Sequence, residues 1–381
     1  MFLIAGEHSG DALGARLMAA LKTQSAGRTG FAGVGGPRME AEGLDSLFPM
    51  SDLSVMGLAE VLPRVPKLLR RLRQTVAEIK VRRPSAVVTI DAPDFCFPVA
   101  KRLKGLGIPL IHYVAPQVWA WRPGKAKVAA KLFDRLMVLL PFETPYFEAV
   151  GLPSTFVGHP VVEIGADGGD GQAFRRRHGI PAEAPLICVL PGSRGNETVR
   201  LLPIFGDTLA LLRKNLPDLR AVVPTVEAVA EQVTAAAAGW TLTPLITRDQ
   251  ADKHEIFAAA DAALAASGSV TLELAVAKTP TVIAYKLNPL TALLARRLVR
   301  VRYINLVNLI LNRQALPEFL QENCTPEKLA TALAGILADD AARRAQRAAF
   351  EVVLQRLGLG GPPPSEKAAE IVLSMISEAP S

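Results

Sequence analysis

A carboxylate stands at the end of one of the most apolar segments of the sequence. The segment 86–90 reads as a buried strand, and Asp91 ends it, in the run DAPD. A carboxylate at a strand end can reach a ligand and accept a proton from a hydroxyl group as a general base. The alternative is a turn carboxylate that caps the following helix, and Asp94, beyond Pro93, also fits that description. Asp91 is therefore the candidate catalytic base, with Asp94 as its competitor.

The turn after the first expected strand, AGEHSGD at 5–11, is crowded with polar side chains. Its two glycines allow a ligand to approach closely, and Glu7, Ser9 and Asp11 could contact that ligand. The turn is neither GxGxxG nor a Walker loop, so a dinucleotide or ATP site is not indicated. The alternative is a tight turn in which Ser9 or Asp11 caps the next helix.

The uncharged segment HYVAPQVWAW at 112–121 combines a histidine with two of the three tryptophans. Trp119 and Trp121 could stack on a sugar ring or line a channel for acyl chains, and they could equally belong to the core. His112 is a candidate for the same site. With Glu7, it is the next group to test as a base if neither aspartate acts.

A glycine-serine loop in the second half of the chain indicates a site for an anion. The loop PGSRGNE follows the expected strand 186–190. Gly192 and Ser193 offer hydrogen-bond donors, the next helix presents its positive amino end, and Arg194 can hold phosphate oxygens in a bidentate fork. A mere turn would need only the glycine, so we favour an anion site.

A second such loop, ASGSVTLE, follows the expected strand 261–265. Ser267, Gly268 and Ser269 could cap a helix whose end binds phosphate, and Glu273, one turn further on, could accept hydrogen bonds from ribose hydroxyls. A capped helix with Glu273 in solvent fits the same residues.

No metal site is predicted. The three cysteines, Cys96, Cys188 and Cys324, lie far apart without a CxxC spacing, so neither a disulfide framework nor a thiolate zinc site is indicated. Asp91 and Asp94 are separated by a proline, and no histidine stands at a helical spacing from them. A reducing cytoplasm fits this cysteine usage.

Two segments are both basic and amphipathic, at 55–73 and at 290–302. Such segments favour an anionic bilayer surface, and an ordinary half-buried helix with a solvated charged face is the alternative. No stretch is long enough to span a bilayer, because prolines interrupt the longest uncharged run, 108–121. The apolar residues expected to contact acyl chains or membrane are Val55, Met56, Leu58, Val61 and Leu62.

The composition is that of a folded protein with an anionic partner. Of 381 residues, 50% are hydrophobic and 21% charged, which excludes a disordered or fibrous chain. The formal charge of +7 points to nucleic acid, an acidic membrane surface or a phosphorylated substrate. Nucleic acid is disfavoured, because aromatic residues make up only 6% and no nucleic-acid-binding motif is recognised. The apolar start at 2–5 is too short for a signal peptide, so we expect a cytoplasmic protein.

Short apolar runs alternate with helix-period segments, and this pattern predicts the elements that hold these residues. The expected strands lie at 2–5, 31–34, 86–91, 109–113 and 135–140 in a first series and at 186–190, 219–223, 241–246, 261–265 and 280–285 in a second. The polar, glycine-rich DGGDG at 167–171 reads as a linker. We therefore predict an α/β protein with two Rossmann-like, doubly wound domains, at 1–166 and 172–340, which face a cleft, followed by a helical tail at 341–381.

Taken together, these segments closely resemble lipid-A-disaccharide synthase, a family of GT-B glycosyltransferases. Their order and spacing cover nearly the whole chain, so the resemblance is specific although each motif alone is weak. A small departure is His8, which stands where threonine is common. The matching segments are AGEHSGD, GGPRMEAEG at 35–43, VMGLAEVL at 55–62, IDAPDF at 90–95, HYVAPQVWAWR at 112–122, LPFE at 140–143, GHP at 158–160, LPGSRGNE at 190–197, ASGSVTLE at 266–273 and VNL at 307–309.

The resemblance implies transfer of a 2,3-diacylglucosamine unit, with inversion, from UDP-2,3-diacylglucosamine to the 6-hydroxyl of 2,3-diacylglucosamine 1-phosphate, without a metal or other cofactor. It implies that Asp91 lies beside the acceptor hydroxyl and that the acceptor and acyl chains lie in the first domain. It implies that UDP lies on the second domain, with its diphosphate at Arg194, its ribose at Glu273 and Asn308 nearby. It further implies peripheral association with the inner face of the cytoplasmic membrane.

A UDP-N-acetylglucosamine 2-epimerase on the same architecture is the main alternative. Such an enzyme acts on a soluble substrate and needs no apolar stretch such as 55–62, so dependence on lipid or detergent separates the two. A basic nucleic-acid-binding protein is the alternative from another class, and failure of the pure protein to bind UDP would favour it.

Overall fold

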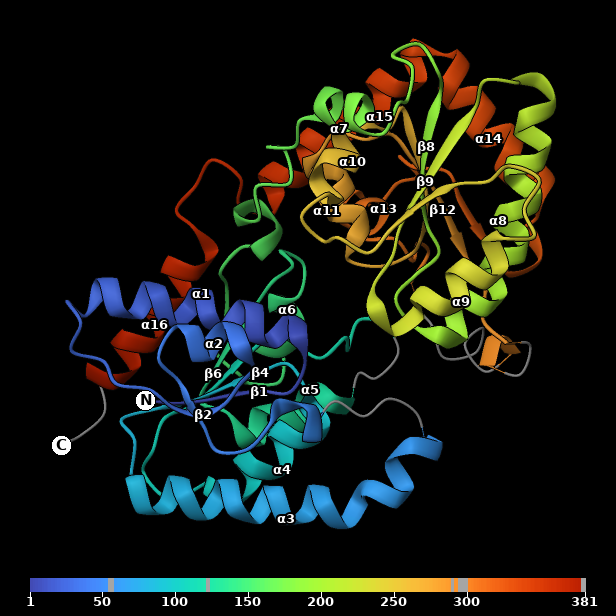
Figure 1. Cartoon of the computed structure of the whole chain (residues 1–381). Helices are drawn as coiled ribbons and strands as arrows, with labels where there is room; N and C mark the ends of the chain where they lie inside the picture. Colours follow the sequence, from blue (N-terminus) through green and yellow to red (C-terminus); the bar gives the residue numbers. More distant parts are fainter. Residues whose placement is uncertain (54–57, 121–123, 289–290, 294–300, 378–381) are drawn as a thin grey trace. The chain divides into compact units, whose positions relative to one another are not determined.

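Two compact units make up the chain in the computed structural model, which describes residues 1–53, 58–120, 124–288, 291–293 and 301–377, with the backbone alone at 58–64. The first unit comprises Met1–Pro160 and Gly360–Ser381, and the second comprises Val161–Leu359. Each unit holds a parallel β-sheet, and helices cover both faces of each sheet (Figure 1). The predicted α/β class with two doubly wound sheets is confirmed.

In the described residues of the first unit, seven strands run parallel in the order β3-β2-β1-β4-β5-β6-β7. The strands are β1 (Phe2–Ala5), β2 (Ala32–Val34), β3 (Asp45–Ser46), β4 (Val87–Ile90), β5 (Leu110–Tyr113), β6 (Arg135–Val138) and β7 (Ser154–Phe156). The helices are α1 (His8–Gln24), α2 (Pro37–Ala41), α3 (Leu58–Arg82), α4 (Pro93–Leu103), α5 (Gly124–Leu132), α6 (Thr144–Glu148) and α16 (Pro364–Ser377). Because the order reverses between β1 and β4, the carboxyl ends of these strands flank the crevice in which a doubly wound sheet binds ligands.

Side chains of the central strand β1 point alternately to the two faces of the sheet, and helices cover both faces. Phe2 and Ile4 belong to the buried cluster with α3, α4 and α5, whereas Leu3 and Ala5 belong to the cluster with α1. All four side chains are fully buried. The last helix, α16, packs along α1 on this second face and thereby completes the first unit (Figure 1).

In the second unit, six parallel strands follow the order β10-β9-β8-β11-β12-β13 among the residues described. The strands are β8 (Leu186–Leu190), β9 (Arg220–Pro224), β10 (Leu245–Thr247), β11 (Ala262–Ala266), β12 (Thr281–Tyr285) and β13 (Glu318–Leu320). The helices are α7 (Gly171–Arg177), α8 (Gly195–Asn215), α9 (Glu227–Ala237), α10 (Lys253–Ala259), α11 (Val270–Val276), α13 (Leu306–Leu311), α14 (Pro326–Ala338) and α15 (Asp340–Arg356). The order reverses between β8 and β11, so the same rule puts a ligand at the carboxyl ends of these two strands.

The division between the units differs from the predicted one. The DGGDG segment is not a linker, because it packs into the second unit, where a Cβ on Gly169 or Gly171 would clash with the backbone of α10. Asp170 also caps α7 by accepting the Ala173 N–H (2.8 Å). The predicted tail, 341–381, is divided, because α15 packs on helices of the second unit whereas α16 joins the first.

The short edge strands have no clear sequence signal. β3, β7 and β13 are two or three residues long, which is too short for an alternating pattern to stand out, and the sequence does not predict them. The strand expected at 241–246 begins only at Leu245. The long central strands that carry the candidate site were all predicted.

Candidate active site

The end of β4 carries strained backbone. Asp91 and Ala92 have positive φ angles, 51° and 44°. This conformation costs a residue with a side chain about 1–2 kcal/mol, and such strain is typical of functional sites. The Asp91 N–H donates to the Tyr113 carbonyl of β5 (2.8 Å), which fixes the strand end. Asp91 is therefore the first carboxylate beyond the strand, as the sequence predicts.

The turn AGEHSGD meets this strand end. A Cβ on Gly6 would lie 2.8 Å from the Ala92 Cβ, so glycine is needed for the two turns to approach each other. Glu7 is the half-buried N-cap residue of α1, and Ser9 is exposed in the first turn of that helix. Glu7, Ser9 and Asp91 thus share the carboxyl edge of β1 and β4, where the strand order reverses.

The two candidate aspartates have different surroundings. Burial raises the pKa of the Asp91 carboxyl above its usual range, and a hydrogen bond with the Ala92 backbone lowers it in part. The Asp94 side chain is 94% exposed, and its carboxylate pairs with Lys125 at 3.4 Å. The expectation that Asp94 caps α4 is wrong, because Ala92 is the N-cap residue of this helix. A carboxyl with a raised pKa is the stronger base, which favours Asp91.

Asp11 does not face a ligand. It is 2% exposed, and its carboxylate accepts the N–H groups of Gly36 (2.8 Å), Arg38 (3.1 Å) and Met39 (3.0 Å). These groups lie at the start of α2 and would otherwise lack a partner. The prediction of Asp11 as a ligand contact is therefore corrected to a structural role, which no local sequence pattern indicates.

His112 belongs to the core of the first unit. It is fully buried in β5, stacks on Phe133 with ring centroids 4.7 Å apart, and places Nδ1 2.7 Å from the Thr89 hydroxyl. Burial lowers the pKa of the imidazole to about 3, so the ring is neutral near neutral pH. The prediction that His112 contacts the acceptor is wrong, because strand alternation directs this side chain toward the helices that cover the sheet.

Trp119 is held by a carboxyl group whose role the sequence does not reveal. The indole N–H donates to Glu143 Oε1 (3.0 Å), and the Leu140 N–H donates to Oε2 (3.0 Å). Glu143 is 3% exposed, and burial raises its pKa to about 7. The half-buried indole also meets the Phe142 ring edge-on at 5.3 Å. Trp119 is thus anchored to the turn after β6, and its contact with an acceptor stays a prediction.

A pocket of about 300 Å³ lies at the carboxyl ends of β8 and β11 in the second unit. The two glycine-serine loops that line it follow β8 and β11, the strands between which the order reverses. This topology explains how residues far apart in the sequence come together. The predicted residues that line the pocket are Gly192, Ser193, Arg194, Ser267, Gly268, Ser269 and Glu273.

The first loop presents hydrogen-bond donors to this pocket. Arg194 is the N-cap residue of α8, and both Arg194 and Ser193 are exposed. Gly192 has a φ of 106°, and a Cβ there would clash with the Glu197 carboxyl group. Backbone N–H groups at the start of this 21-residue helix and an adjacent guanidinium are the groups that bind phosphate in proteins.

The second loop takes part in an ion pair that the sequence does not predict. The Glu273 carboxylate lies 2.7 Å from Lys253 Nζ, and the two side chains are 16% and 26% exposed. Lys253 begins α10 and brings a second cation to the pocket. It follows no glycine loop and has no characteristic spacing, so only the fold reveals it. Other pocket residues that the sequence analysis does not assign to the site are Glu197, Thr225, Gln250 and Tyr285.

Asn308 is a structural residue. It is fully buried in α13, and its Oδ1 accepts the N–H groups of Ala315 (2.8 Å) and Leu316 (2.9 Å). Its Nδ2 donates to the Leu316 carbonyl (3.0 Å) and to Glu318 Oε2 (3.1 Å). The prediction that Asn308 contacts UDP is corrected, because these bonds occupy the whole amide group.

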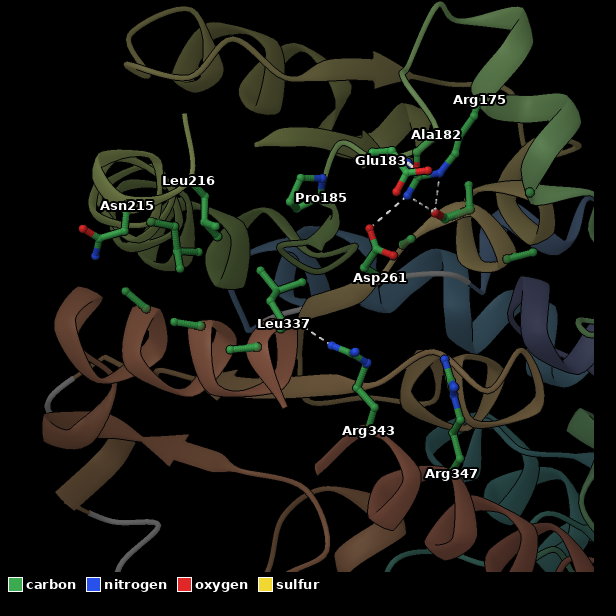
Figure 2. Close-up of a pocket in the computed structure, with 18 of the residues that line it drawn as sticks. Arg175, Ala182, Glu183, Pro185, Asn215, Leu216, Asp261, Leu337, Arg343 and Arg347 are labelled. Atoms are coloured by element: carbon green, nitrogen blue, oxygen red, sulfur yellow. Dashed lines mark hydrogen bonds and ion pairs between the residues drawn. The ribbon is translucent and has the colours of Figure 1, made fainter. Parts of the chain in front are cut away.

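A larger cavity, of about 1540 Å³, lies at the opposite edge of the second sheet, where β8 and β11 begin (Figure 2). Arg175 is 4% exposed there, donates to the Ala259 carbonyl (3.0 Å) and pairs with Asp261 at 2.9 Å. Arg343 donates to the Leu337 carbonyl near the end of α14 (2.6 Å). These contacts join neighbouring segments of the second unit, and none of the predicted site residues is among the described residues that line this cavity.

The predicted acyl-chain contacts fall largely beyond what the structure describes. Val55 and Met56 lie outside the described residues, and Leu58, Val61 and Leu62 fall in the first turns of α3, where the backbone alone is described. Among the helices described, none is long and apolar enough to cross a membrane. The described part of the chain also holds no group of three His, Cys, Asp or Glu side chains that could bind a metal ion.

Comparison with known proteins identifies close relatives over the whole chain. Residues 1–372 match the family model described as lipid-A-disaccharide synthetase. The lipid-A-disaccharide synthase of Rhodospirillum centenum is 57% identical over 380 residues, which cover 99% of this chain and 95% of that protein. That of Paramagnetospirillum magneticum is 51% identical over 382 residues, which cover 99% and 98%.

Solved structures are similar at low sequence identity. Acinetobacter baumannii MurG has a TM-score of 0.59 at 16% identity, with 98% of this chain and 99% of that one covered. The UDP-GlcNAc 2-epimerase of Neisseria meningitidis, bound to UDP-GlcNAc, has a TM-score of 0.63 at 10% identity, with 99% and 98% covered. At such identity the likeness shows the fold alone, which is the GT-B fold predicted from the sequence.

Proposed function

The chain belongs to the lipid-A-disaccharide synthetase family and is a glycosyltransferase of lipid A biosynthesis, and on this basis we propose which substrates it joins and how. The donor is UDP-2,3-diacylglucosamine, and the acceptor is 2,3-diacylglucosamine 1-phosphate, whose 6-hydroxyl attacks with inversion at the anomeric carbon. The observation that carries this proposal is the pocket between β8 and β11, which both glycine-serine loops and two cations, Arg194 and Lys253, line.

UDP binds in this pocket. Arg194 forms a bidentate pair with diphosphate oxygens, and the N–H groups of the Gly192 loop and of the first turn of α8 add further hydrogen bonds. Segment 267–269 contacts the phosphates from the second loop, and Glu273 accepts hydrogen bonds from the ribose hydroxyls. The hydrogen bonds from these donors become stronger as negative charge builds on the departing UDP. Removing one such donor raises the activation free energy by about 3 kcal/mol.

Asp91 accepts the proton of the acceptor 6-hydroxyl. As this proton moves to the carboxylate, the hydroxyl oxygen bonds to the anomeric carbon, and the bond from that carbon to UDP breaks with its electron pair left on UDP. The raised pKa of Asp91 supports this role, because a general base works best when its pKa approaches the working pH. Its short side chain on a rigid strand end suits a base that must reach one oxygen. Glu7, Ser9 and Trp119 contact the acceptor.

UDP binds without a metal cofactor. Arg194 supplies positive charge to the diphosphate, and Lys253, which pairs with Glu273, brings a second cation to the pocket.

The acyl chains reach the enzyme from the inner face of the cytoplasmic membrane. The formal charge of +7 and the basic amphipathic segment 55–73 support binding to an anionic surface. The residues of this segment that contact acyl chains or the bilayer are Val55, Met56, Leu58, Val61 and Leu62.

The test is product formation by the purified protein from UDP-2,3-diacylglucosamine and radiolabelled 2,3-diacylglucosamine 1-phosphate, followed by thin-layer chromatography with and without EDTA. We expect the acylated disaccharide 1-phosphate and UDP in equal amounts, at a rate that EDTA leaves unchanged. UDP-N-acetylglucosamine alone should give no epimer. A folded protein that forms no disaccharide, or that epimerises UDP-N-acetylglucosamine, would overturn the proposal, and a loss of activity with EDTA that magnesium restores would overturn its metal-free mechanism.

A further inference from the structure

Glu197 is an acidic side chain inside a pocket that is suited to an anion. It lines the pocket from the first turn of α8, three residues after Arg194. Its carboxyl group lies against Gly192, since it occupies the space that a Cβ on this glycine would need. A diphosphate that binds the N–H groups of the Gly192 loop therefore meets this carboxyl group.

Glu197 does not make the hydrogen bond that a glutamate at this helix position usually makes. A glutamate three residues after the N-cap residue often accepts the N–H of that residue. Here no hydrogen bond or ion pair joins the Glu197 carboxyl to another residue that the structure describes. The carboxyl is thus available to a ligand in the pocket.

The titratable and charged groups that share the pocket with Glu197 come from four elements. Arg194 lies at the start of the same helix, and its positive charge lowers the pKa of Glu197 in part. Tyr285, at the end of β12, lies close enough for burial and then the Glu197 charge to raise the pKa of its hydroxyl. Lys253 of α10 and Glu273 of α11 also line the pocket and pair with each other.

A bound diphosphate changes the charge balance around this carboxyl. In the free protein, burial raises the pKa of Glu197, and Arg194 lowers it in part. A diphosphate adds negative charge nearby and takes the Arg194 guanidinium as its own partner, and both effects favour the protonated carboxyl. A carboxylate would repel the phosphate oxygens, whereas a neutral carboxyl can donate a hydrogen bond to one of them.

We propose that Glu197 takes up a proton from solvent when UDP binds and donates a hydrogen bond to a diphosphate oxygen. The inference rests on the proposed function, since it requires UDP in the pocket between β8 and β11. The proton returns to solvent when UDP leaves. UDP therefore binds most tightly below the pKa of Glu197 in the free protein, and this advantage is lost as the pH rises through the higher pKa of the complex.

Isothermal titration calorimetry with UDP, in two buffers of different ionisation enthalpy, measures this proton uptake. The terminal phosphate of UDP itself titrates near pH 6, so the relevant quantity is the difference between the wild type and Glu197→Gln, which mimics the neutral carboxyl. Across the pH range in which Glu197 titrates, we expect the wild type to take up more protons per UDP than the variant. At high pH, where Glu197 is ionised with and without UDP, the variant should bind UDP about tenfold more tightly than the wild type, for a pKa that rises by about one unit on binding, and this difference should shrink as the pH falls.

Glu231→Gln is the matched control, because this carboxylate is exposed on α9 and does not line the pocket, and it should behave as the wild type. If Glu197→Gln does not fold, Glu197→Ala replaces it, because it also lacks the titrating group.

Equal proton uptake and equal affinity of the wild type and the variant would overturn the inference. So would a gain of UDP affinity with Mg²⁺ that only the wild type shows, because Glu197 would then be a metal ligand. A wild type that binds no UDP would overturn the proposed function as well.

Discussion

The two sheets reverse their strand order in the same way, and yet their carboxyl edges differ. At the edge of β4 and β5, three residues with side chains have positive φ angles: Asp91, Ala92 and Val114, the last at 79°. Two acidic side chains of the first unit, Asp11 and Glu143, are held by hydrogen bonds to backbone N–H groups. At the edge of β8 and β11, the polar side chains instead line a pocket of about 300 Å³.

This difference fits the two tasks that we propose for the two edges. A catalytic base must be a single group in a fixed position, which strained backbone and engaged neighbours provide. A site for a diphosphate needs several donors that remain accessible until the ligand binds. In the proposed function, the first unit supplies the base and the second the anion site, although both use the switch point of a doubly wound sheet.

The largest effect is expected at Asp91. Asp91→Asn keeps the shape of the side chain and removes its basicity, so turnover should fall by about 10² to 10⁴ in a radiolabelled disaccharide assay. Turnover of the wild type should rise with pH through the raised pKa of Asp91, because only the ionised carboxylate accepts the proton, and the variant should lose this dependence. Asp94→Asn is the control and should change turnover little. If the two results are reversed, Asp94 is the base.

The next effect is expected on stability, at Asn308. Asn308→Ala leaves the N–H groups of Ala315 and Leu316 without their partner and removes one of the hydrogen bonds that the Glu318 carboxylate accepts. We expect the free energy of unfolding in urea to fall by about 3 kcal/mol. UDP affinity of the folded variant should be unchanged, and a selective loss of UDP binding would restore Asn308 to the site. Asn215→Ala, at the exposed end of α8, is the control and should cost less than about 0.5 kcal/mol.

A somewhat smaller effect is expected at Arg194. Hydrogen bonds to charged groups contribute about 1.5–3 kcal/mol, so Arg194→Ala should weaken UDP binding by roughly tenfold to a hundredfold in calorimetry. The melting temperature should barely change, because the side chain is exposed. Arg213→Ala in the last turn of the same helix, outside the pocket, is the matched control. Unchanged UDP affinity in Arg194→Ala would remove this residue from the site.

An effect that depends on pH is expected from His112. Its pKa is about 3 in the folded protein and near 6.5 when unfolded, so the unfolded state binds more protons between these values. Stability should therefore fall as the pH falls from 6.5 toward 3, by about 1.4 kcal/mol per unit for this group. Urea unfolding at pH 7 and pH 5 should show a smaller loss in His112→Phe than in the wild type. An equal loss in both would show that His112 is not buried neutral.

The sequence predicts those parts of the site that are local. Asp91 follows its strand directly, and the loops of Arg194 and Ser267 follow theirs, so strand pattern and residue type suffice to find them. The misassigned residues are those whose surroundings come from distant segments. Asp11 is bound by N–H groups of α2, and His112 is enclosed by rings of other elements. The local sequence of a polar residue cannot show which distant groups will surround it.

The limits of the two units are not predicted correctly from the sequence, for a related reason. Glycine-rich polar sequence is typical of linkers, but Gly169 and Gly171 are needed where the chain passes close to the backbone of α10. The sequence does not predict the role of Lys253, because that role depends on its ion pair with Glu273, which lies on another helix. At each of these positions, the role of the residue depends on a tertiary contact and cannot be read from the residue type alone.

The division of tasks between the two units is tested most directly by titrating UDP into Asp91→Asn. If the base lies in the first unit and UDP binds only to the second, the dissociation constant for UDP should stay within about twofold of the wild type in a variant whose turnover has fallen at least about 10². Loss of UDP affinity in Asp91→Asn, to the degree expected for Arg194→Ala, would contradict the account, because the two edges would then form one binding site for UDP.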